Sequence, residues 1–173
     1  MPFPEQDPPT FEPMEYPSAA DLNLIRDWLD AFRNETFITA EHNFTDERTN
    51  YNYGPLDSEA GPEVTFIAGP DGRVMLYIYA HLLADSAGDN AFASYEIERV
   101  ADNQIVVEAG NPRSIRTRQA LTESAQHVWR EELIPGEEYV ARMMFRGSDS
   151  GDNQAAKMRS TYRKLIVDRV YVP

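Results

Sequence analysis

From about residue 63 to the end of the chain, apolar and polar residues alternate with a period of two. Such alternation places successive side chains on opposite faces of an extended strand. Turn-forming residues interrupt the pattern at 69–72 (Gly-Pro-Asp-Gly) and 135–136 (Pro-Gly). About eight strands at hairpin spacing, with no helix between them, indicate an antiparallel β-sandwich or jelly roll. The expected strands are 63–68, 73–83, 91–100, 104–108, 114–122, 125–134, 137–146 and 157–172.

The first 60 residues follow a different pattern. Residues 1–17 contain six prolines, each of which fixes φ and removes a backbone donor, so we expect an extended arm. Residues 18–35 begin with a partial capping box at Ser18 and Asp21 and read as a short amphipathic helix. Residues 36–60 are polar with scattered aromatics and read as a linker. The mostly β protein is thus predicted to have its head domain at residues 61–173.

The arm and the helix carry apolar side chains that have no core of their own. Two heptads are too few for a stable isolated coiled coil, and a helix of this length is marginal alone in water. The helix therefore needs its own head, a symmetry mate or a host surface to pack on. Candidate docking or oligomer-interface residues in this region are Phe3, Phe11, Met14, Tyr16, Leu22, Ile25, Trp28, Leu29 and Phe32.

Two predicted strands are apolar on both faces. In residues 74–79, Val74, Leu76 and Ile78 share one face, whereas Met75, Tyr77 and Tyr79 share the other. Residues 139–145 likewise place Tyr139, Ala141, Met143 and Phe145 opposite Val140, Arg142 and Met144. A sandwich needs only one apolar face per sheet. A second face rich in Tyr and Met has the composition of an interface core, so Met75, Tyr77 and Tyr79 join the candidate interface residues, although the N-terminal segments of the same chain are an alternative cover.

Charge and hydropathy exclude two classes of partner. The chain carries a net charge of −13, and residues 1–60 hold 13 acidic against 3 basic residues. Nucleic-acid binding needs a basic face, which this composition does not offer. No apolar stretch approaches the ~20 residues of a membrane-spanning helix. The acidic N-terminal region suits either plain solvation or a basic partner surface.

Candidate catalytic and metal constellations are weak. The loops at 85–90 (Asp-Ser-Ala-Gly-Asp-Asn) and 149–153 (Asp-Ser-Gly-Asp-Asn) offer oxygen ligands for calcium, but the same residues are ordinary in hairpin loops. His42, His81 and His127 lack the spacing of a zinc site. No nucleophile elbow is present, and a glycosidase carboxylate pair cannot be recognised without its pocket. We expect no cofactor and no enzymatic activity.

Residues 18–27 (Ser-Ala-Ala-Asp-Leu-Asn-Leu-Ile-Arg-Asp) resemble a helix near the start of many phage virion proteins from actinobacterial hosts. The end of the chain resembles their C-terminal jelly rolls: Leu-Ile-Pro-Gly-Glu-Glu-Tyr at 133–139, Phe-Arg at 145–146, a Gly-Ser-Asp loop at 147–149, and an Arg-Lys-Leu-Ile-Val strand from 163. The resemblance covers residues 18–35 and 60–173. It implies a non-enzymatic structural component of the virion, a minor tail or fibre-like protein, and a homotrimer.

The resulting hypothesis is an arm that docks on other virion proteins and a β-sandwich head that is displayed, tail-associated and in contact with the host. One alternative is a capsid decoration protein that stabilises the shell. Another is a glycan-binding module that contacts a host-surface glycan. A hydrolase is a third class, and a deep pocket with two carboxylates would be its sign.

Overall fold

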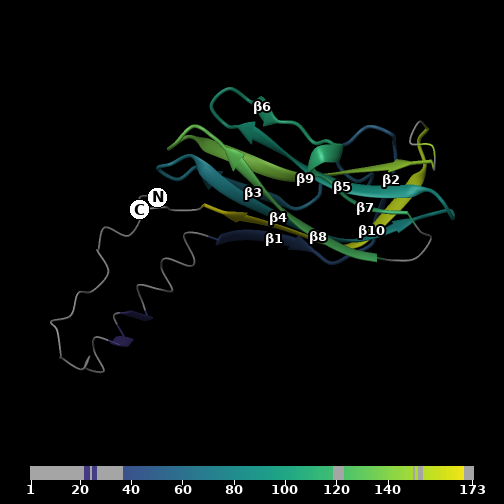
Figure 1. Ribbon diagram of the computed structural model, residues 1–173, viewed down its shortest axis with the longest axis horizontal. Coiled ribbons are helices and arrows are strands. Elements are labelled where there is room, and N and C mark those ends of the chain that lie inside the picture. Colours follow the sequence, from purple (N-terminus) through teal and green to yellow (C-terminus); the bar gives the residue numbers. More distant parts are fainter. Residues whose placement is uncertain are drawn as a thin grey trace.

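The computed structural model describes residues 22–23, 25–26, 37–118, 123–149, 151 and 154–169. Two five-stranded antiparallel sheets stack face to face (Figure 1), which confirms the predicted antiparallel sandwich of jelly-roll type. Sheet A consists of β1 (Phe37–His42), β2 (Asp46–Thr49), β4 (Arg73–Ala84), β8 (Glu123–Glu132) and β10 (Lys157–Asp168). Sheet B consists of β3 (Glu63–Ile67), β5 (Asn90–Arg99), β6 (Gln104–Val107), β7 (Ile115–Thr117) and β9 (Glu138–Ser148).

Long strands form the centre of each sheet. In sheet A the order is β1-β10-β4-β8, with β2 also on β10; in sheet B it is β3-β9-β5-β6, with β7 on β5. The eight strands expected after residue 60 are all present, with β7 ending at Thr117 and the described part of β10 at Asp168. A 3-10 turn, η1 (Asn111–Arg113), lies between β6 and β7.

The segment 36–60 is not a linker, because it contributes two strands to sheet A. β1 pairs with the second half of β10, from Phe37↔Asp168 to His42↔Arg163. β2 pairs with the first half of the same edge, from Lys157↔Thr49 to Ser160↔Asp46. Both are short edge strands whose outer positions face solvent. Because of these polar positions, the alternation of a strand is hard to recognise in the sequence of this segment. The expected domain boundary near residue 61 falls within a single sandwich, since residues on both sides of it belong to sheet A.

The faces assigned from alternation agree with the structure. Val74, Leu76 and Ile78 of β4 point into the sandwich and are at most 1% exposed. Tyr139, Ala141, Met143 and Phe145 of β9 face them from sheet B and are equally buried. Burial of this apolar surface from both sheets is the main stabilising contribution to the fold.

Helical residues occur where the sequence predicts a helix. Leu22, Asn23, Ile25 and Arg26 are helical and lie within the expected range 18–35. The proline-rich arm at 1–17 and the other residues of the helix range lie outside the described residues. Within the described part of the chain, no helix is long and apolar enough to cross a membrane.

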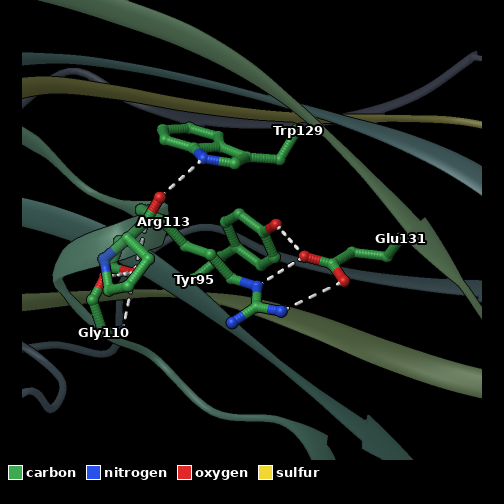
Figure 2. A network of polar contacts seen from close by, with 7 residues as sticks. Tyr95, Gly110, Arg113, Trp129 and Glu131 are labelled. Atoms are coloured by element: carbon green, nitrogen blue, oxygen red, sulfur yellow. Dashed lines mark hydrogen bonds and ion pairs between the residues drawn. The ribbon is translucent and has the colours of Figure 1, made fainter.

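A polar network joins the two sheets at one end of the core (Figure 2). The hydroxyl of Tyr95 on β5 donates to Oε1 of Glu131 on β8 over 2.5 Å. Arg113 in η1 donates to the same carboxylate through Nε at 2.6 Å. Trp129 packs on Tyr95 with ring centroids 5.6 Å apart and donates from Nε1 to the carbonyl of Pro112. Burial, with the neighbouring Glu131 carboxylate, raises the pKa of Tyr95, so its hydroxyl remains a donor.

Replacing Tyr95 with Phe should lower the free energy of unfolding by about 1–2 kcal/mol, because a hydrogen bond to a charged, mostly buried acceptor is lost. Tyr139 provides a matched control, since it is equally buried but its hydroxyl accepts from the backbone amide of Ile134 in an exposed turn. There water can replace the hydroxyl, so Tyr139→Phe should cost less. Urea denaturation of both variants measures the difference. Equal losses would contradict a special contribution from Glu131.

Candidate functional site

The outer face of sheet A is hollowed into a groove of about 830 Å³. We call it the aromatic groove. It runs across the outer side of β10, β4 and β8, the three neighbouring strands of the sheet. The residues that line it are Tyr77, Tyr79, His81, His127, Val128, Tyr162, Lys164 and Ile166, together with Ile78, whose side chain points into the core.

Strand register brings these side chains together. In the ladder between β4 and β10, Tyr77 faces Ile166 and Tyr79 faces Lys164. On the other side of β4, Tyr77 faces Val128 of β8. Cross-strand neighbours on one face lie close enough for their side chains to pack. The floor of the groove is therefore apolar beside Tyr77, and the rest of the groove is richer in aromatic and polar groups.

Three rings form a cluster in the groove. The ring centroids of Tyr79 and Tyr162 are 5.3 Å apart and nearly perpendicular, at 73°. His81 lies 5.3 Å from Tyr79 and 5.6 Å from Tyr162. Separations of this size are those at which aromatic pairs attract one another. All three side chains are only partly buried, so the cluster is held in place while it remains in contact with solvent.

Polar contacts fix the orientation of the rings. The hydroxyl of Tyr79 lies 2.7 Å from Nε2 of His81 and shares a hydrogen bond with it. The hydroxyl of Tyr162 donates to Glu41 of β1 over 3.1 Å. Lys164 Nζ lies 3.5 Å from the same Oε2 atom of Glu41. Burial, followed by the hydrogen bond to Glu41, raises the pKa of Tyr162, so the hydroxyl keeps its proton.

The sequence predicts that this face is apolar and assigns it to a subunit interface, a role that remains a prediction. Met75, Tyr77 and Tyr79 lie on the outer face of sheet A as expected, and Tyr77 and Tyr79 line the groove whereas Met75 does not. Alternation does not identify Glu41, His81, Val128, Tyr162, Lys164 and Ile166 as residues of this site. They come from strands far apart in the chain, and only the register of the sheet brings them together.

The structure places few of the N-terminal candidates. Leu22 is helical and 55% exposed, and Ile25 is helical and half-buried. The other candidates of this region, Phe3, Phe11, Met14, Tyr16, Trp28, Leu29 and Phe32, lie outside the described residues. Their docking role remains a prediction.

The two Asp-rich loops lie side by side. Asn90 of the first loop donates to the carbonyl of Asp149 in the second over 2.7 Å. Asp85 forms an ion pair with Arg159 at 2.8 Å. No group of three or more potential metal ligands is found among the described residues, which exclude 150 and 152–153 of the second loop.

A second, smaller cleft of about 460 Å³ lies on sheet B. Arg146 is one of its lining residues, and its guanidinium lies 4.1 Å from the ring centroid of Phe92 and about 5 Å from those of Tyr51 and Tyr53. Two carboxylates, Glu96 and Glu108, line it. Glu96 lies 3.9 Å from the guanidinium of Arg142, and Glu108 is exposed, so the cleft is polar and charged where the aromatic groove is apolar.

No known protein family and no curated protein matches the sequence. Several solved structures are similar in fold. The CBM22-1 xylan-binding domain of Paenibacillus barcinonensis Xyn10C is 14% identical with a TM-score of 0.39, over 76% of this chain and 87% of that domain. The Eiger TNF of S. frugiperda is 8% identical with a TM-score of 0.43, over 80% of this chain and 96% of that chain. The infectious bursal disease virus VP2 subviral particle is 10% identical with a TM-score of 0.49, over 76% of this chain and 31% of that chain. These likenesses concern the arrangement of strands only.

Proposed function

We propose that this chain is a non-enzymatic structural protein of a phage virion. Its N-terminal arm and helix attach it to other virion proteins, and its β-sandwich head is displayed, tail-associated, for contact with the host. The protein acts as a homo-oligomer, and a trimer is preferred. The virion setting rests on the resemblance of residues 18–27 and 133–173 to virion proteins of actinobacteriophages.

The observation that carries the proposal is the second, outward face of sheet A. One face of this sheet closes the core, and the other presents an ordered aromatic groove to solvent. A sandwich whose outer faces bound no partner would have polar outer faces. The polar groups of the groove are engaged with one another, Tyr79 with His81 and Tyr162 with Glu41, which fixes rings for binding.

The place where the chain enters the sandwich supports attachment through the N-terminus. The helical residues lie about ten residues before Phe37, which begins β1 at the edge of sheet A. Leu22 exposes most of its apolar side chain. An exposed apolar side chain on a short amphipathic helix is suited to packing against a partner.

Substitutions in the helix test the attachment. In the full-length chain, Leu22→Asp combined with Ile25→Asp should reduce incorporation into virions at least tenfold, because two charges would be placed in the docking face. Asn23→Asp is the matched control, since Asn23 is helical and exposed but polar. Quantitative immunoblotting of purified particles measures incorporation. Normal incorporation of the double variant would refute the docking role of the helix.

A further inference from the structure

We propose that the aromatic groove binds a neutral oligosaccharide. The inference rests on the proposed function, because it names the kind of host molecule that the displayed head contacts. It assigns to Tyr77, Tyr79, His81 and Tyr162 the packing surface, and to Glu41 and Lys164 the polar rim.

The shape and chemistry of the groove fit a small ligand better than a flat subunit contact. A volume of about 830 Å³ lies within the range of ligand sites, which are mostly apolar with a few fixed polar groups. The ring cluster and its hydrogen bonds exist before any ligand arrives. Pre-organisation of this kind lowers the entropic cost of binding. A flat subunit interface would need no such hollow.

Sugars match both parts of this surface. The C–H groups on the face of a pyranose ring are apolar and pack on aromatic rings such as those of Tyr77, Tyr79 and Tyr162. Its hydroxyl groups both donate and accept hydrogen bonds. Tyr and His side chains can do the same, Glu41 accepts and Lys164 donates, so each kind of sugar hydroxyl contact has a partner at the groove.

The charges of the groove favour a neutral ligand. Beside the ring cluster, the ammonium group of Lys164 lies 3.5 Å from the carboxylate of Glu41. The two largely cancel, so the groove attracts neither anions nor cations strongly. A nucleic acid is further disfavoured by the net charge of −13.

The backbone of the sheet disfavours an extended peptide as occupant. Peptides that add to a sheet use the unpaired N–H and C=O groups of an edge strand. Beneath the groove, β4 is paired on one side with β10 and on the other with β8. At β4 and β10, which are paired on both sides, the groove therefore offers side chains only. A purely apolar ligand such as a lipid chain would desolvate Glu41, Lys164 and the Tyr hydroxyls without compensation.

Binding to a glycan array tests the proposal with the full-length chain. The array should carry neutral oligosaccharides of hexoses, pentoses and N-acetylhexosamines, together with acidic ones, and the strongest interaction should be measured by isothermal titration calorimetry. We expect binding to neutral oligosaccharides. Tyr79→Ala and Tyr162→Ala should each weaken the affinity at least tenfold, and Tyr162→Phe, which keeps the ring, should weaken it less.

Tyr51→Ala is the matched control, because Tyr51 is an exposed tyrosine that lines the second cleft on sheet B. It should leave the affinity unchanged. No binding to any neutral oligosaccharide by the folded chain, or binding to acidic ones only, would overturn the proposal. So would unchanged affinity in both groove variants, or loss of binding in Tyr51→Ala alone. Sedimentation velocity adds one more contrary outcome: a groove variant that dissociates the oligomer, without glycan binding by the parent chain, would make the groove a contact between copies.

The two proposals fail separately. Tyr79→Ala protein should still enter virions, because attachment uses the N-terminal helix. Leu22→Asp/Ile25→Asp protein should still bind the oligosaccharide.

Discussion

Arg163→Ala should lower the free energy of unfolding by about 3–5 kcal/mol, the cost of removing one member of a buried charged group. Arg163 is fully buried on the inner side of β10. Its Nη1 donates to the carbonyls of Phe44 and Ser160, each at 3.1 Å, and its guanidinium lies 4.5 Å from the ring centroid of Phe44. Burial lowers the pKa of Arg163, and the nearby charges of Asp46 and Glu59 oppose that shift.

The substitution would also leave an acidic group without its neighbouring positive charge. Asp46 is buried and accepts from the backbone amides of Glu47, Ser58 and Glu59. Burial alone would raise the pKa of Asp46, but these hydrogen bonds outweigh it and the pKa is lowered, so the carboxylate stays charged. The alanine variant would thus combine a cavity with a buried carboxylate that has lost a nearby positive charge.

Arg159 on the same strand is the matched control. It is partly exposed and forms ion pairs with Asp85 and Glu47. Exposed pairs contribute little, so Arg159→Ala should cost about 1 kcal/mol or less. Chemical denaturation of both variants gives the comparison. A loss below about 1 kcal/mol for Arg163→Ala would mean that the buried guanidinium contributes little to the stability of the fold.

Gly72→Ala should lower the free energy of unfolding by about 3 kcal/mol, from two causes. Gly72 has φ of +71°, where an L-residue with a Cβ is disfavoured by about 1–2 kcal/mol. A Cβ there would also lie 2.1 Å from the carbonyl oxygen of Leu133, whose amide donates to Gly72. Because that atom is backbone in a paired turn, the clash must be relieved by moving the chain, at a further cost of about 1–3 kcal/mol.

Gly136→Ala separates the two causes. Gly136 has nearly the same φ, +76°, but a Cβ there would meet nothing within 4 Å. Gly136→Ala should lower the free energy of unfolding only by the cost of a positive φ, about 1 kcal/mol. Thermal denaturation followed by circular dichroism measures both variants. Equal losses at the two glycines would show that the contact with Leu133 does not limit the turn.

Alternation and the spacing of turn residues were enough to predict the sandwich. Alternation placed Val74, Leu76 and Ile78 inside and Tyr77 and Tyr79 outside, as found. It could not predict β1, because an edge strand needs only Ile38 and Ala40 on its inner face and the remainder reads as polar loop.

The remainder of the site depends on register and on one irregularity. A shift between Ser160 and Tyr162 changes which residues of β10 face inward. Met158 and Leu165 both face the core. Counting every second residue forward from Met158 would place Arg163 on the outer face, whereas counting back from Leu165 places it on the inner face, where it is found. Only the bulge decides between these, and bulges leave no clear sequence signal. The same shift sets Tyr162 beside Tyr79 and His81.

Electron cryomicroscopy of the intact virion shows which surface of this chain faces its neighbours. We expect density for the N-terminal helix against other virion proteins, and the outer face of β4, β8 and β10 open to solution. A reconstruction in which Tyr77, Tyr79 and Tyr162 are covered by a neighbouring subunit, with the helix exposed, would contradict this expectation.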